Sequence, residues 1–209
     1  MCLPNTICCL ISLECLEISG CPNFECLPEN LGNVKGLKKL GLSGTAIKEL
    51  PSSVQFLIGL TSLNLRNCKK FVLLPSTICS LKSLDEIILI GCSKFDKLPK
   101  NLGNIVSLKG LYLSGTAIKE LPSSIELLIS LANLHLKDCK KFVLHPSTNC
   151  SLKSLETMLL SRCPKFVKLP ENFGNLKHLY WLSFEGTAIE VLPTSVGSLA
   201  ALKFLNLKD

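Results

Sequence analysis

Leucine and similar apolar residues recur along the chain in alternation with small or polar ones. The frame L-x-x-L-x-L-x-x-(C/T) starts at Leu13, Leu37, Leu60, Leu84, Leu108, Leu131, Leu155, Leu179 and Leu202. The L-x-L alternation is typical of a short β-strand whose leucines point inward and whose intervening residues point outward. One strand at each start predicts a single parallel sheet.

The second half of each period has a different pattern. It reads C-x-x-F-x-x-L-P or T-A-I-x-x-L-P, followed by apolar residues three or four apart, as in Leu121, Ile125 and Leu128. That spacing indicates a helical or 3-10 turn, at whose start proline is tolerated. A strand and a turn at this period are the signature of leucine-rich repeats. We predict an α/β repeat solenoid, a leucine-rich-repeat horseshoe with the parallel sheet on its concave face and short helical, 3-10 or irregular convex segments.

The repeats extend over essentially the whole chain. We expect residues 13–209 to form one continuous solenoid and residues 1–12, which contain Leu3, Pro4, Ile7 and Leu10, to be a truncated N-terminal half-repeat. Repeat arrays need capping units at their ends. Because neither end has a polar cap, we expect a fragment of a larger chain.

The ninth position of the frame holds cysteine or threonine. These residues are Cys21, Thr45, Cys68, Cys92, Thr116, Cys139, Cys163 and Thr187. A thiol is a small hydrophobe with a weak donor and a hydroxyl is a donor, so both suit a buried ladder that binds loop carbonyls. We assign these eight residues a structural role.

The twelve cysteines do not predict a disulfide framework or a metal site. Disulfide scaffolds are shorter chains with a secretory signal, and none is recognisable here. Zinc sites need closely paired thiolates, and no C-x-x-C is present in the cluster Cys2, Cys8, Cys9, Cys15, Cys21 and Cys26. We expect no metal and no cofactor.

Groups of repeats recur with a longer period. The segment SGTAIKELPSS at Ser43–Ser53 recurs unchanged at Ser114–Ser124, 71 residues later, so three repeats form one duplicated unit. The strand LTSLNLRN at 60–67 has become LANLHLKD at 131–138, with every outward residue changed and every leucine kept. Variation between the copies is therefore concentrated on the outward strand face.

Apolar and aromatic residues occupy several outward strand positions. The candidate protein-binding residues on this face are Arg66, Ile88, Ile90, Tyr112, His135, Leu159, Trp181 and Phe204. An apolar patch with aromatic anchors is typical of a protein interface. The alternative is a set of scattered surface residues that a neighbouring domain covers.

Charge adds a second candidate surface. The 23 basic and 16 acidic residues give a net charge of +7, but the chain has only two arginines, Arg66 and Arg162, and no aromatic-rich basic patch, so we expect no nucleic-acid partner. A basic flank recurs at the repeat pitch: Lys69, Lys70, Lys94, Lys140, Lys141 and Lys165. It could dock an acidic domain; the alternative is a solubilising surface.

Catalysis finds no support in the sequence. No phosphate-binding loop, nucleophile elbow or H-E-x-x-H motif is present. His145 and Asn149 replace core leucine and isoleucine, which we interpret as a loosened repeat rather than a ligand site. No stretch approaches the roughly 20 apolar residues of a membrane span. We expect a non-enzymatic intracellular chain.

The repeats closely resemble those of a known family. The forms GTAIxxLP, as in Ser43–Ser53, and CxxFxxLP, as in Cys92–Pro99, are similar to the repeat domain of plant intracellular immune receptors of the TIR, nucleotide-binding, leucine-rich-repeat class. The resemblance implies a cytoplasmic location, with the nucleus as an alternative.

The same resemblance implies a role in defence signalling. In that family the array senses a pathogen effector or a guarded host protein and restrains the nucleotide-binding domain of its own chain. The NAD-cleaving TIR domain of the family is absent here, so no enzyme activity carries over. The alternative is a free-standing intracellular scaffold, or a truncated decoy, that binds a signalling protein.

Overall fold

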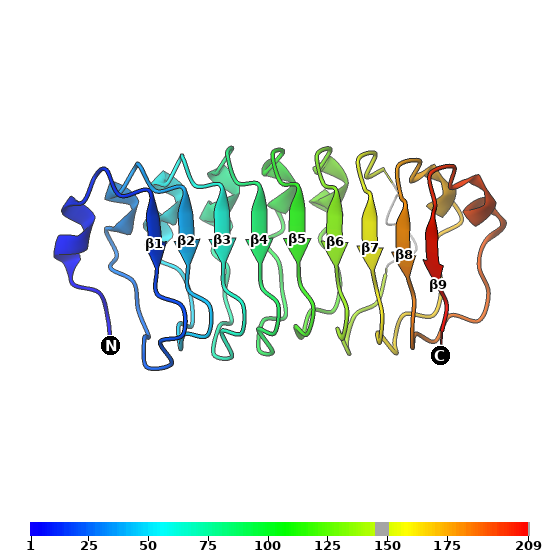
Figure 1. Cartoon of the computed structure of the whole chain (residues 1–209), viewed down its shortest axis with the longest axis horizontal. Helices are drawn as coiled ribbons and strands as arrows, with labels where there is room; N and C mark the ends of the chain where they lie inside the picture. Colours follow the sequence, from blue (N-terminus) through cyan, green and yellow to red (C-terminus); the bar gives the residue numbers. More distant parts are fainter. Residues whose placement is uncertain (145–150, 209) are drawn as a thin grey trace.

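Nine parallel strands form one open sheet in which strand order follows sequence order. The computed structural model describes residues 1–144 and 151–208, so His145 and Asn149 lie outside the described residues. The strands stand side by side from β1 to β9 (Figure 1). They are β1 (Cys15–Glu17), β2 (Lys39–Gly41), β3 (Ser62–Asn64), β4 (Glu86–Ile88), β5 (Gly110–Tyr112), β6 (Asn133–His135), β7 (Thr157–Leu159), β8 (Trp181–Ser183) and β9 (Phe204–Asn206). The predicted leucine-rich-repeat solenoid is confirmed.

Each strand begins two residues after one of the nine frame starts. Its central apolar residue pairs laterally with the same position of the next strand, as Leu40 does with Leu63 and Leu63 with Ile87. Because successive side chains of a strand point to opposite sides, this register leaves the flanking residues of every strand on the outer surface. We call that surface the strand face.

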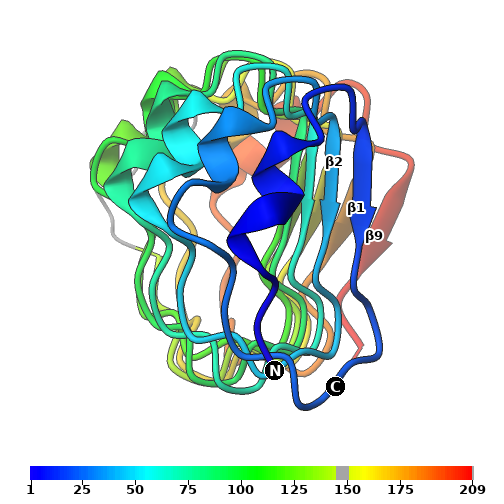
Figure 2. The ribbon, with the colours of Figure 1, turned by 90° about the vertical axis from the view of Figure 1, so that its left-hand side faces the viewer.

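Short 3-10 helices form the other side of the solenoid (Figure 2). They are η1 (Asn5–Cys9), η2 (Leu31–Asn33), η3 (Ser52–Phe56), η4 (Ser76–Ser80), η5 (Leu102–Asn104), η6 (Ser123–Leu127), η7 (Phe173–Asn175) and η8 (Thr194–Ser198). A proline in extended conformation directly precedes η3, η4, η6 and η8. Segments of three to five residues are too short to nucleate an α-helix. The tighter 3-10 turn fits instead.

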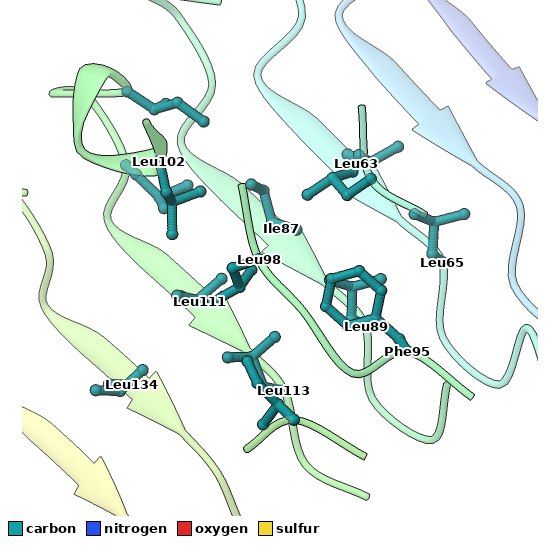
Figure 3. Packing of buried hydrophobic residues seen from close by; sticks show 14 of the residues in the cluster. Leu63, Leu65, Ile87, Leu89, Phe95, Leu98, Leu102, Leu111, Leu113 and Leu134 are labelled. Carbon is teal, nitrogen blue, oxygen red and sulfur yellow. The ribbon is translucent and has the colours of Figure 1, made fainter. Parts of the chain in front are cut away.

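The hydrophobic core lies between the sheet and the helices. Leu63, Ile87 and Leu111 from successive strands and Phe95 from a loop pack together there (Figure 3). The phenylalanines of the C-x-x-F segments stack from repeat to repeat, with ring centroids 5.9 Å apart for Phe71 and Phe95. Burial of each such side chain contributes about 1.5–3 kcal/mol. The core is therefore continuous along the array.

Four cysteines and three threonines of the ninth position hydrogen-bond loop carbonyls. The thiols of Cys68, Cys92, Cys139 and Cys163 donate to carbonyls of the preceding repeat, at 3.0, 3.0, 3.2 and 3.0 Å. The hydroxyls of Thr45, Thr116 and Thr187 donate to a carbonyl three residues earlier, each at 2.7 Å. Cys21 and Thr187, near the two ends of the described array, are only half-buried. Cysteine thus connects neighbouring repeats, whereas threonine closes a turn within its own repeat. The hydroxyls of Thr45 and Thr116 also lie 3.4 and 3.5 Å from the thiols of Cys68 and Cys139 in the next repeat.

One pair of cysteines is bridged, although the sequence does not predict a disulfide framework. Cys2 and Cys26 form a disulfide, with their Cα atoms 4.9 Å apart. Their separation of 24 residues is one turn of the solenoid, and the two residues pair in an isolated parallel bridge. Chain length and the lack of a recognisable secretory signal spoke against a disulfide framework, whereas the repeat pitch places two cysteines one period apart side by side.

Three glycines allow neighbouring helical segments to approach closely. Gly32, Gly103 and Gly174 recur every 71 residues, and their N–H groups donate to the hydroxyls of Ser53, Ser124 and Ser195 at 3.2, 3.1 and 3.3 Å. A Cβ atom on any of them would collide with the backbone carbonyl of that same serine. Glycine is therefore required there by the repeat spacing.

We expect Gly103→Ala to lower the free energy of unfolding by about 1–3 kcal/mol, because the added methyl group must displace the backbone of Ser124. Gly197→Ala in η8 is the matched control, since nothing lies within 4 Å of its added Cβ. The control should be neutral or stabilising by up to about 1 kcal/mol. Chemical denaturation measures both variants, and equal stability of the two would contradict the close approach.

Thiol alkylation tests the buried ladder. Cys9 and Cys15 are exposed and should react in the native protein at pH 8. Burial raises the pKa of Cys163 to about 12 and that of Cys79 to about 11, so both thiols stay protonated. Their reaction needs local unfolding and should be slower by on the order of a hundredfold. Mass spectrometry after iodoacetamide treatment measures the rates, and rapid native labelling of Cys163 would rule out this burial.

Candidate functional site

Four of the candidate residues form a continuous row across the strand face. Strand register places Ile88 of β4 beside Tyr112 of β5, Tyr112 beside His135 of β6, and His135 beside Leu159 of β7. We call these four residues the apolar row. Polar or small residues adjoin it, namely Asn64 on β3 and Ser183 on β8. The structure therefore aligns residues from four successive repeats, which together span 71 positions of the sequence.

The apolar row is half-buried, although the sequence argument described its members as exposed. Neighbouring strands lie only about 4.8 Å apart, so large side chains in one row shield each other. Ile90, beyond the end of β4, is also half-buried, whereas Arg66 is exposed. The side chains of the row thus pack against one another and are not isolated surface residues.

Trp181 and Phe204 form a separate aromatic pair on the same face. Their rings stack with centroids 4.8 Å apart at 16°, and they are 41% and 58% exposed. They occupy the first positions of β8 and β9, a different lateral row from Leu159. The strand face therefore carries two apolar areas, of which the aromatic pair is the more exposed.

The three copies of the 71-residue unit differ sharply at the positions of the row. The first copy has Glu17, Gly41 and Asn64, the second has Ile88, Tyr112 and His135, and the third has Leu159, Ser183 and Asn206. Only the second copy carries three large, mainly apolar side chains in succession. Its strands provide three of the four residues of the apolar row.

His135 lacks the hydrogen bond that asparagine makes at this position in the other copies. The side-chain oxygens of Asn64 and Asn206 accept backbone N–H groups two residues later, at 3.0 and 3.1 Å. The His135 ring instead meets the Tyr112 ring edge-on at 4.9 Å, and its Nε2 is buried without a partner. Burial lowers the pKa of His135, so the ring is neutral at pH 7.

A polar hollow of about 300 Å³ lies beside the apolar row. Its lining includes Ser62, Asp85, Glu86, Lys109, Tyr112 and Asn133. Gly110 contributes no side chain here, and the Tyr112 ring folds back against it. Sequence reasoning missed this hollow. The available signal was glycine inside a strand, which often marks a place where another group approaches the backbone closely.

The basic flank is partly engaged in contacts within the chain. The Nζ of Lys69 donates to the Gly91 carbonyl at 3.0 Å, and Lys70 and Lys140 lie 3.4 and 3.6 Å from Glu25 and Asp138. The other three flank lysines are exposed: Lys94, Lys141 and Lys165. Exposed ion pairs contribute little stability. No single built site emerges from the flank.

The described ranges, 1–144 and 151–208, contain neither a metal-binding cluster nor a membrane-spanning helix. No group of three or more His, Cys, Asp or Glu residues within them is arranged to hold a metal ion. No helix in the same ranges is long and apolar enough to cross a bilayer.

The pH dependence of stability should reveal the buried His135. Its folded pKa lies below the unfolded value of about 6.5, so the unfolded chain binds the proton more tightly. Stability should therefore be fully present above pH 6.5 and fall as the pH drops from there through the folded pKa. His135→Asn, which restores the residue of the other copies, should remove this part of the slope. Denaturation at several pH values measures it, and an unchanged slope would contradict the burial.

Comparison with known proteins places these repeats. Residues 9–102 match the family described as "Disease resistance protein RPS4B-like, leucine-rich repeats". A probable disease resistance protein of Arabidopsis thaliana is 40% identical over 95% of this chain and 11% of its own length. TMV resistance protein N of Nicotiana glutinosa is 40% identical over 95% of this chain and 18% of its own length.

A solved structure confirms the fold independently. The leucine-rich repeat domain of the type III effector XopL superposes with a TM-score of 0.89 at 23% identity, over 98% of this chain and 72% of that one. At that identity the likeness concerns the fold alone. The kind of protein to which these repeats are similar is indicated by the two sequence relatives. The chain spans only 11% and 18% of their length. Over most of its length the chain is therefore similar to the leucine-rich repeats of plant disease resistance proteins.

Proposed function

We propose that this chain is a non-catalytic protein-recognition module whose strand face binds a pathogen effector or a host protein that the receptor guards. The names of its relatives associate such repeats with disease resistance. Leucine-rich-repeat solenoids use their extended strand surface for binding. As part of a longer receptor in the cytoplasm, the array would also contact and restrain the nucleotide-binding domain of its own chain.

The continuous apolar row is the observation that carries this proposal. Ile88, Tyr112, His135 and Leu159 lie on four adjacent strands, and the Trp181–Phe204 pair extends the apolar area to β9. Aromatic residues within a partly desolvated patch supply most of the binding energy in protein interfaces. The leucines beneath the row are fully buried, so the outer residues are free to vary without loss of the fold.

Replacement of Tyr112, Leu159 and Trp181 by alanine should abolish partner capture and leave the fold intact. The partner would be captured from infected plant tissue and quantified by mass spectrometry against the unmodified array. Loss of each large interface side chain typically weakens binding by about 1–4 kcal/mol, so the triple variant should bind at least a hundredfold more weakly. Circular dichroism and the melting temperature report the fold.

A matched control uses exposed apolar residues on the helical side. Ile58, Leu127 and Ile129 are 65%, 57% and 61% exposed and lie outside the strands, at the end of η6 or two residues after η3 and η6. Their triple replacement by alanine should leave capture unchanged. If instead capture survives the strand-face changes and is lost in the control, the recognition surface lies on the helices.

A further inference from the structure

The polar hollow beside the apolar row has a distinctive charge arrangement. Asp85 and Lys109 neutralise each other, with 3.2 Å between their charged atoms. Glu86 is half-buried and its carboxylate accepts a hydrogen bond from the Ser62 hydroxyl at 2.6 Å. Within residues 1–144 and 151–208 this carboxylate forms no ion pair within 4 Å. Glu86 is therefore a carboxylate in the hollow that lacks a cation.

Tyr112 places an aromatic ring in the same hollow. Its ring lies against Gly110, whose missing side chain leaves room for it. Burial, and then the nearby Glu86 carboxylate, raise the pKa of Tyr112, so the hydroxyl keeps its proton. An aromatic ring beside an unpaired carboxylate matches a planar cation, which can stack on the ring while it hydrogen-bonds the two oxygens.

The internal copies supply an independent observation. The position of Glu86 holds Cys15 in the first copy and Thr157 in the third, and that of Tyr112 holds Gly41 and Ser183. Both residues are therefore particular to the second copy, on the adjacent strands β4 and β5. The duplicated unit acquired the acid and the aromatic ring at the same place.

The remaining charge in the hollow lies at its opposite end. Lys39 on β2 is exposed and is separated from Glu86 by Ser62 on β3. A cation that enters on the β4–β5 side meets Glu86 and Tyr112 first, with Lys109 already paired to Asp85. Lys39 therefore lies at the far side of Ser62 from the β4–β5 side of the hollow.

We propose that the hollow between β2 and β6 is a specificity pocket for an arginine side chain of the partner, held by the Glu86 carboxylate and the Tyr112 ring. This inference rests on the proposed function, because it names the chemistry of the partner at the same face. Arginine fits better than lysine because its guanidinium is planar and offers a fork of donors to a carboxylate. The adjacent apolar row receives the apolar neighbours of that arginine.

The test uses a small probe and needs no identified partner. N-acetyl-arginine N′-methylamide is titrated into the full chain labelled with ¹³C at the tyrosine rings. The chain has two tyrosines, Tyr112 and the more distant Tyr180, so Tyr112→Phe assigns both signals. We expect a saturable shift of the Tyr112 signal in the roughly millimolar range, typical of one ionic and one stacking contact. Tyr180 should not follow it.

Two matched comparisons make the result specific. The citrulline analogue, which is neutral and nearly isosteric, should shift Tyr112 weakly or not at all, and the lysine analogue should bind more weakly than arginine. Glu86→Gln should weaken arginine binding by about tenfold through loss of the charge-assisted contact. Glu156→Gln, at the position equivalent to Asp85 in the third copy, should leave the affinity unchanged.

Each contrary result overturns the pocket. No shift of Tyr112, an equal shift with citrulline, equal binding of lysine, or undiminished affinity of Glu86→Gln would each refute arginine recognition. If the strand-face alanines abolish partner capture but arginine does not bind, the proposed function stands and only the pocket is refuted. Arginine binding without any partner capture would leave the pocket and remove the proposed function.

Discussion

The lateral pairing of short strands at a fixed spacing is the constraint on which the rest of the molecule depends. Each repeat has only three strand residues, and it cannot bury its leucines except against the repeats on either side. Once the strands pair in register, the core leucines, the stacked phenylalanines and the Cys/Thr ladder all recur at the same pitch. The close approach at Gly32, Gly103 and Gly174 belongs to the same geometry, because the helical segments must keep the spacing that the sheet imposes.

That constraint separates the residues that maintain the fold from those that are free to change. The inward leucines of β3 and β6 are identical, whereas every outward residue differs between these two strands. An outward side chain contacts mainly its lateral neighbours and solvent, so replacement there leaves the core intact. A solenoid built in this way presents a rigid surface with variable chemistry, which suits recognition of a partner and does not require a catalytic centre.

The 71-residue duplication makes this separation visible within one chain. Asn64, His135 and Asn206 occupy the same place, yet only the histidine is left with a buried nitrogen that has no partner, because it exchanges a local hydrogen bond for a ring contact with Tyr112. Likewise, Glu86 and Tyr112 replace smaller residues of the other copies on adjacent strands. The second copy has therefore diverged toward a surface that carries most of the apolar row, with the polar hollow beside it.

The sequence by itself determined the repeat, its period, the strand and turn of each unit, the ladder residues and the face on which variation gathers. These follow from periodicity, since an inward or outward direction is a local property of a strand. The tertiary structure alone decided which side chains meet. The Cys2–Cys26 disulfide joins residues one turn apart, the apolar row aligns residues of four successive repeats, and the hollow is lined by residues of the five adjacent strands β2 to β6. Such contacts depend on the pitch and register of the stacked repeats, which no single repeat contains.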